Sequence, residues 1–272
     1  MSSKTKSSRQ GKTPKPQHRP RKGQTWLWIL LVLTAVAVSS LWWDRLLPPP
    51  PPMPKIPVAL NNEFSTNQTS PKTNAPTDPG EQAMALLNEG VQLFAQGKIQ
   101  EAIAKYKQAA EKNPDDEDVY YNLGIAYAAL GKTNEAETAY RKAIEIFPEH
   151  AEAHNNLGNL LMRTGRRQEA EKVFQELLRF APDNSSGYNN YGSLLARMGR
   201  LDEAMKQFEM ALTKDGQHVE ARYNYANALL LQRQWDAAIT NYEMILKERP
   251  NWAPAQRRLK EARDAKALSE GK

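Results

Sequence analysis

Apolar and polar positions in the last two thirds of the chain repeat with a period of 34 residues. One set of small residues comprises Gly90, Gly124, Gly158 and Gly192, with Ala226 in the fifth place. A second set, seven residues later, comprises Gly97, Gly131, Gly165 and Gly199, with Arg233 in the fifth place. Next come Ala102, Ala136, Ala170, Ala204 and Ala238, then Tyr106, Tyr140, Phe174, Phe208 and Tyr242. A fixed period of this length indicates a repeat architecture.

Each unit is expected to contain two helices of about 13 residues with a glycine-marked turn between them. Small residues let the two helices approach closely, and the aromatic residue fills the gap to the neighbour. Pro114, Pro148, Pro182 and Pro250 end the second helices, and Gly216 replaces the fourth proline. The pattern predicts an all-α solenoid of five units over 81–252, followed by a charged capping helix at 253–272. The units are 83–116, 117–150, 151–184, 185–218 and 219–252.

The stretch "YNLGIAYAALGKTNEAETAYRKAIEIFP", which ends at Pro148, resembles the tetratricopeptide repeat family. The resemblance covers about residues 83–252, with departures at Glu89, Ala226, Arg233 and Gly216. It implies a superhelix of helical hairpins in which the first helices of successive units line a concave inner surface. In the family, that surface binds a protein or peptide partner.

An asparagine occupies the same place in all five units: Asn88, Asn122, Asn156, Asn190 and Asn224. Asparagine is a mediocre helix former, so its recurrence needs a reason. The resemblance places this asparagine row on the inner surface, where carboxamides suit the backbone of an extended peptide. The row is similar to the asparagine ladder of O-linked N-acetylglucosamine transferases, although their catalytic half has no counterpart here. The alternative is a structural row that serves packing or hydrogen bonds between helices.

Eight further residues are expected on the same inner face and complete the predicted partner-binding set: Tyr121, Asn155, Asn159, Asn189, Tyr223, Asn227, Arg163 and Arg197. The tyrosines would add apolar contact, and the arginines would favour acidic groups. The family's carboxylate clamp needs a lysine one place before the row in its first unit. Leu87 stands there, so that specificity is not expected.

The stretch 25–43 contains no charged residue and has tryptophans at both ends, which predicts one transmembrane helix. The preceding tail, 1–24, holds eight Lys/Arg and no acid, so the N-terminus is expected on the cytoplasmic side. A proline-rich spacer and flexible linker, 44–80, would hold the repeats away from the membrane on its far side, most simply the periplasmic side of a bacterial inner membrane. Cleavage after the small residues near Ala37, as in a secretory signal, is the alternative.

Charge and reactive residues point away from catalysis. The net charge of +6 belongs to the tail, because the remainder carries 29 basic and 31 acidic side chains. Cysteine is absent. His150 and His154 have the i,i+4 spacing of a zinc pair, but they lack the His-Glu-x-x-His pattern, so an ordinary solvated pair is expected. Neither a catalytic residue, a metal nor a cofactor is predicted.

The sequence therefore predicts a single-pass membrane scaffold, not an enzyme, that binds an extended segment of a partner protein, in the assembly of an envelope complex. One alternative is an accessory or sensor subunit that recognises a small molecule or glycan in the same groove. A weaker alternative is binding of nucleic acid through the basic tail, which would make affinity fall steeply with salt.

Overall fold

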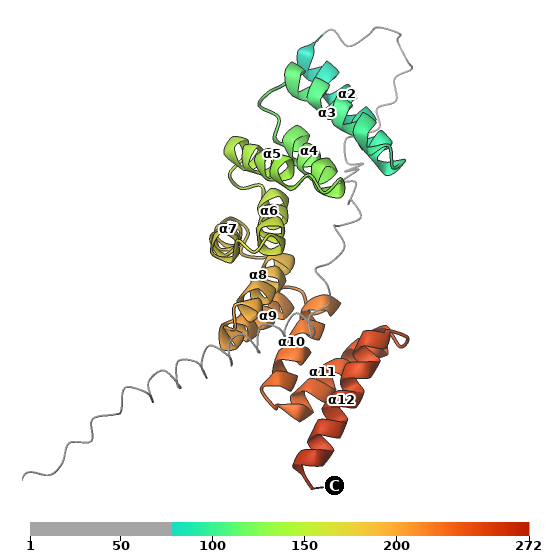
Figure 1. Ribbon diagram of the computed structural model, residues 1–272, viewed down its shortest axis with the longest axis vertical. Coiled ribbons are helices and arrows are strands. Elements are labelled where there is room, and N and C mark those ends of the chain that lie inside the picture. The colour runs from blue at the N-terminus through green and yellow to red at the C-terminus, as the bar shows by residue number, and fades with distance from the viewer. Residues whose placement is uncertain (1–77, 272) are drawn as a thin grey trace, which may run out of the picture. The chain divides into compact units, whose positions relative to one another are not determined.

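The computed structural model describes residues 78–271, and within that range all regular structure is helical, in eleven helices without strands (Figure 1). The helices are α2 (Pro79–Ala95), α3 (Ile99–Lys112), α4 (Glu117–Ala129), α5 (Thr133–Ile146), α6 (Ala151–Arg163), α7 (Arg167–Phe180), α8 (Ser185–Arg197), α9 (Leu201–Lys214), α10 (Val219–Leu231), α11 (Trp235–Glu248) and α12 (Ala253–Ser269). Each packs against the next in sequence. The predicted all-α solenoid is thus confirmed.

Among the helices of 78–271, none combines the length and the apolar character needed to cross a membrane. The predicted span at 25–43 lies outside the described residues, as do the basic tail and all but the last three residues of the spacer. Helix α2 begins at Pro79, inside the stretch expected to be linker. Asp78 starts it, because its carboxylate accepts a hydrogen bond from the Glu81 amide at 3.4 Å and proline tolerates the first helical position.

The two helices of a unit meet at the first set of glycines. A Cβ atom on Gly124 would lie 2.5 Å from the Tyr140 ring, and one on Gly158 would lie 2.6 Å from the Phe174 ring. Both rings are fully buried, so they have no room to retreat. The glycine and the aromatic residue 16 positions later therefore form one packing contact, which explains why the sequence repeats them together.

The turn within each of the first four units uses a left-handed backbone conformation. Gly97, Gly131, Gly165 and Gly199 have φ between +72° and +80°. Arg233 takes the same place in the fifth unit, with φ of 59°, and among residues 78–271 it is the non-glycine residue with positive φ. A side chain makes this conformation costly, so the fifth unit carries backbone strain that the others avoid.

Ion pairs that repeat every 34 residues connect the central units. Arg166, at the turn before α7, lies 2.6 Å from Glu169 and 2.5 Å from Glu137 of the preceding unit. Arg200, one period later, lies 2.7 Å from both Glu203 and Glu171. We call these two sets the arginine bridges. Each joins the second helix of one unit to the turn of the next.

Helix α12 covers the apolar face of the fifth unit. Its Ala255, Leu259 and Ala262 are buried in a cluster with Tyr242 and Ile245 of α11. Pro254 stands in its first turn. The rest of α12 carries many charged side chains, as a terminal helix with one face in water requires.

Candidate binding surface

The asparagine row lies along the first helices of the five units, and its members differ in exposure. Asn88 is exposed on α2, while Asn122 on α4 and Asn156 on α6 are half-buried. Asn190 on α8 and Asn224 on α10 are 8% and 5% exposed. The end of the row nearer the N-terminus therefore offers its amides to a partner more readily than the other end does.

Three members of the row donate hydrogen bonds to the preceding unit. Nδ2 of Asn190 donates to Oδ1 of Asn155 at 2.8 Å, and Nδ2 of Asn224 donates to Oδ1 of Asn189 at 2.9 Å. Nδ2 of Asn156 makes a longer bond of 3.4 Å to the hydroxyl of Tyr121. The acceptor is in each case 35 residues earlier. These amides thus join successive first helices, as the structural alternative requires.

The first two members lack such a partner for a simple reason. The residue 35 positions before Asn122 is Leu87, which has no polar side-chain atom. Nδ2 of Asn122 instead donates to the Asp118 carbonyl of its own helix at 2.8 Å. Asn88 belongs to the first unit, so no described unit precedes it.

The other residues predicted on the inner face also differ in solvent exposure. Tyr121, Asn155 and Asn159 are half-buried, and Arg163 is exposed in the last turn of α6. Arg197 is half-buried in the last turn of α8, whereas Asn189, Tyr223 and Asn227 are buried. The oxygen of Asn227 accepts a hydrogen bond of 2.7 Å from Tyr242 of α11. Asn227 therefore belongs to the core of its own unit.

The two histidines expected to be solvated are instead buried, which corrects that prediction. His150 and His154 are 8% and 2% exposed. The His154 ring lies 2.8 Å from the Pro148 carbonyl through Nε2 and packs on Phe180. The His150 ring packs on Tyr121 of α4, with centroids 4.8 Å apart. Neighbouring aromatic rings thus shield both histidines from water, His150 in the turn before α6 and His154 within α6.

An open pocket of about 260 Å³ surrounds His150 between α4 and α6. We call it the His150 pocket; its principal lining residues are Glu117, Asp118, Phe147, Glu149, His150 and Glu152. Nδ1 of His150 lies 3.3 Å from a Glu152 oxygen, and Nε2 lies 3.8 Å from Oδ1 of Asp118. Across 78–271, no three His, Cys, Asp or Glu residues are arranged to hold a metal ion.

The charges of the His150 pocket act on one another. The His150 hydrogen bond holds the pKa of Glu152 below its usual value, although burial opposes this. The pKa of Asp118 is raised, chiefly by burial, with His150 acting in the opposite direction and Asp116 and Glu117 adding to the rise. Sequence reasoning missed this pocket. The available signal was the residue just before α4, α6, α8, α10 and α12, which recurs every 34 residues: Asp116, His150, Asn184, His218 and Trp252.

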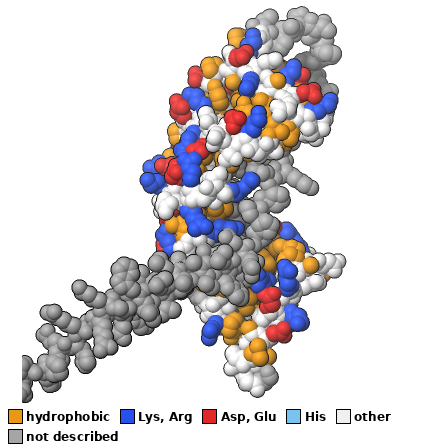
Figure 2. All heavy atoms as spheres, viewed as in Figure 1, with side chains coloured by type: hydrophobic (Ala, Val, Ile, Leu, Met, Phe, Trp, Pro, Cys, Tyr) orange, Lys and Arg blue, Asp and Glu red, His pale blue; other side chains and the backbone are white. Residues whose placement is uncertain are grey.

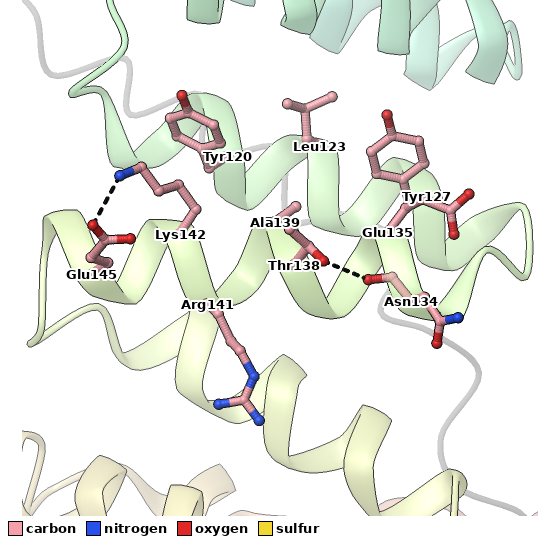
Figure 3. Close-up of a pocket in the computed structure, with 10 residues that line it drawn as sticks. All are labelled: Tyr120, Leu123, Tyr127, Asn134, Glu135, Thr138, Ala139, Arg141, Lys142 and Glu145. Atoms are coloured by element: carbon pink, nitrogen blue, oxygen red, sulfur yellow. Dashed lines mark hydrogen bonds and ion pairs between the residues drawn. The ribbon is translucent and has the colours of Figure 1, made fainter.

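A larger concave feature, of about 710 Å³, lies between α4 and α5 (Figure 3). Tyr120, Leu123 and Tyr127 form its α4 side, and its α5 side includes the Lys142–Glu145 ion pair at 3.1 Å. It contains no member of the asparagine row. On the face drawn in Figure 2, acidic and basic side chains are intermingled over the described helices, so this face has no large region of one charge.

Comparisons with known structures show the fold. The chain is similar to pilF of Pseudomonas aeruginosa, with 23% identity over 70% of this chain and 89% of that one, and a TM-score of 0.61. It is also similar to TTC0263, a thermophilic TPR protein of Thermus thermophilus, with 24% identity over 66% and 98% of the two chains and a TM-score of 0.53. A third is YrrB, described as a TPR protein with an unusual peptide-binding site, with 23% identity over 65% and 91% and a TM-score of 0.53.

No curated protein matches the chain. Sequence models of the TPR repeat match residues 90–131, and those of the tetratricopeptide repeat match 121–185, 173–206 and 195–262. Together these matches run without a gap from residue 90 to residue 262, and all three similar structures share the fold. The chain belongs to the tetratricopeptide repeat family.

Proposed function

We propose that this chain is a membrane-anchored scaffold whose repeats bind an extended segment of a partner protein during assembly of an envelope complex. In this proposal residues 25–43 span the membrane and residues 1–24 lie in the cytoplasm. The proline-rich spacer then presents the repeats on the far side. Repeat proteins of this family act in protein–protein interaction, which supports a scaffold as the general role.

The observation that carries the proposal is the accessible end of the asparagine row. Asn88, Asn122 and Asn156 come from three successive first helices, and Arg163 lies two turns beyond Asn156 on α6. Packed helices lie about 8–10 Å apart, and an extended peptide advances about 3.3 Å per residue. Successive row members would therefore meet about every third residue of a partner segment that runs along the units.

The buried end of the row has a different part in this proposal. Asn190 and Asn224 already donate to the preceding unit, so their bonds keep the first helices at a fixed spacing. The side chains of Asn88 and Asn122, which make no described hydrogen bond to a preceding unit, would then bind the peptide. A peptide-binding site in the similar protein YrrB supports peptide binding as a use of this fold.

Crosslinking of the membrane-embedded protein, followed by identification of the captured segment, supplies the ligand for the decisive titration. Each side-chain hydrogen bond to a peptide is worth about 0.5–1.5 kcal/mol, so the double variant Asn88→Ala, Asn122→Ala should lose about 1–3 kcal/mol of binding free energy. Its melting temperature should change little, because neither amide joins two units.

The matched control is Asn224→Ala, which removes a buried donor between units. We expect it to lower the unfolding free energy and to affect peptide affinity less than the double variant does. Equal peptide affinity for the wild type and a folded double variant would exclude the asparagines from recognition.

Topology is tested separately with a single cysteine, because the chain contains none. Asn134 is exposed in the first turn of α5, so Asn134→Cys places a reactive thiol at the surface. A membrane-impermeant maleimide added to spheroplasts should label it. Labelling that requires lysis of the inner membrane would place the repeats in the cytoplasm and contradict the proposed anchor orientation.

A further inference from the structure

The His150 pocket contains a buried ring nitrogen that lacks a hydrogen bond. His150 is 8% exposed, and its Nε2 atom has no hydrogen-bond partner. The ring is fixed in place by Tyr121, whose ring centroid lies 4.8 Å away, and by Phe147, at 6.3 Å. A polar atom that is buried without a partner is costly, so this nitrogen marks a position where a ligand group would be stabilised.

The neighbours of the ring indicate which kind of group would fit. Nδ1 lies 3.3 Å from the Glu152 carboxylate, which can only accept, so Nδ1 carries a hydrogen and donates it. In the neutral ring, Nε2 then presents a lone pair. The nearest charged atom to it, Oδ1 of Asp118, is another acceptor, 3.8 Å away and too distant for a hydrogen bond. Nε2 and the Asp118 carboxylate are thus two acceptors 3.8 Å apart, and Nε2 has no hydrogen-bond donor.

Acidic residues alone would not identify a ligand site here. Asp118 and Glu152 lie in the first turns of α4 and α6, where carboxylates commonly offset the positive end of a helix dipole. The additional observation is the buried Nε2 atom of His150, which has no hydrogen-bond partner and which a helix dipole does not explain. Both carboxylates keep about two thirds of their side-chain surface exposed, at 66% for Asp118 and 64% for Glu152, so a group from solution can reach them.

We propose that the His150 pocket binds the ammonium group of a lysine side chain in the partner segment. One nitrogen with three donors can bridge Nε2 of His150 and the Asp118 carboxylate, while Glu117 and Glu149 add negative charge at the rim. Phe147, which is 43% exposed, provides an apolar wall for the methylene stem. The inference rests on the proposed function only for the source of the lysine.

The turn that leads into the fifth unit contains a natural control for this pocket. His218 occupies the place of His150 two units later, but both of its ring nitrogens have contacts. Its Nδ1 accepts a hydrogen bond from the Ala221 amide at 3.3 Å, and its Nε2 lies 3.5 Å from the Ser186 hydroxyl. Ser186 also replaces the acid found at Asp118. Lysine should therefore bind at His150 and not at His218.

The test uses the full-length chain in detergent, with only its histidines isotope-labelled. The chain has four histidines, so each ring can be assigned by single substitution in the nuclear magnetic resonance spectrum. The probe is a capped alanine pentapeptide with lysine at its centre, and the matched probe has norleucine there. Because Nδ1 donates to Glu152, the nitrogen shifts should show the ring hydrogen of His150 on Nδ1 and a lone pair on Nε2.

The lysine peptide should shift the His150 ring signals saturably, leave His218 unchanged, and bind about tenfold more weakly to Asp118→Asn. The norleucine peptide should produce no saturable shift. Equal shifts with both peptides, unchanged affinity in a folded Asp118→Asn variant, or a His150 ring protonated at both nitrogens would each overturn the proposal. Failure here is distinguishable from failure of the proposed function, because the groove titration with Asn88 and Asn122 variants does not use this pocket.

Discussion

The central and terminal units of the solenoid follow the same 34-residue pattern, but different contacts hold them to their neighbours. Among the central units, asparagine amides and the arginine bridges cross from one unit to the next. The first unit has an exposed Asn88 in the corresponding place. The fifth keeps an amide hydrogen bond to the fourth through Asn224, but it has Ala226 and Arg233 where the others have glycines, and α12 packs over its apolar face.

This difference shows that a conserved place in a repeat does not fix a residue's role. Asn122 and Asn190 stand two periods apart, yet one bonds within its own helix and the other reaches the preceding unit. The deciding residue lies 35 positions earlier, Leu87 in one case and Asn155 in the other. In a solenoid, each unit's contacts depend on the identity of its nearest neighbour.

Removal of residues 253–272 should have the largest effect on stability. The deletion exposes Tyr242 and Ile245 to water, and the buried Leu259 is removed with α12. We expect the unfolding free energy to fall by at least about 3 kcal/mol, because each fully buried large apolar side chain contributes about 1.5–3 kcal/mol. Urea unfolding measures the change, and a chain that ends at Ser269 is the control. Identical midpoints for both truncations would show that α12 is not a cap.

The glycine contact distinguishes the fifth unit from the others. Gly158→Ala places a Cβ atom 2.6 Å from the buried Phe174 ring and should cost about 1–2 kcal/mol, after better helix propensity offsets part of the overpacking. In the fifth unit, Ala226→Gly should cost about 1 kcal/mol through propensity alone. Denaturant unfolding of both variants makes the comparison. A more stable Gly158→Ala variant would mean that the two helices separate without cost.

Much of this architecture could be predicted from the sequence, because a solenoid repeats its local contacts. The glycine and aromatic positions, the turn glycines and the final helix all follow from the 34-residue period. The burial of His150 did not follow, because it depends on the rings of Tyr121 in α4 and of Phe147, two places that the period does not fix as aromatic. The direction of each asparagine amide likewise depends on a residue in another unit. Contacts within a unit repeat reliably, whereas polar contacts between units vary with single substitutions.

A double-mutant cycle on Asn155 and Asn190 should measure the hydrogen bond between central units. Their bond of 2.8 Å should give a coupling of about 0.5–1.5 kcal/mol in unfolding free energy. The matched cycle uses Leu87 and Asn122, which occupy the same two places one unit earlier. It should give a coupling near zero. Similar couplings in both cycles would show that the row acts in the same way throughout the solenoid.

Arg233→Gly should remove the backbone strain of the fifth unit. A left-handed conformation costs a non-glycine residue about 1–2 kcal/mol, and glycine loses part of that gain through greater freedom in the unfolded chain. We therefore expect a net stabilisation of about 0.5 kcal/mol. Gly165→Arg is the reverse change in a central unit and should destabilise by about 1 kcal/mol. Thermal unfolding of both variants checks the signs, and a less stable Arg233→Gly variant would contradict the strain argument.

The smallest expected effect is the pH dependence contributed by Glu152. The His150 hydrogen bond lowers the pKa of Glu152 in the folded chain from its ordinary 4.5, so the carboxylate stabilises the fold above that pH. This stabilisation is lost as pH falls through the lowered folded pKa. Because the Glu152 side chain is 64% exposed, we expect less than about 0.5 kcal/mol. Glu152→Gln should therefore be slightly less stable than wild type at pH values near 7, and the difference should vanish well below 4.5.

Urea unfolding across this range tests the sign, with Glu149→Gln, at the exposed rim of the same pocket, as the control. A difference that stays constant with pH would mean that Glu152 acts through packing and not through its charge.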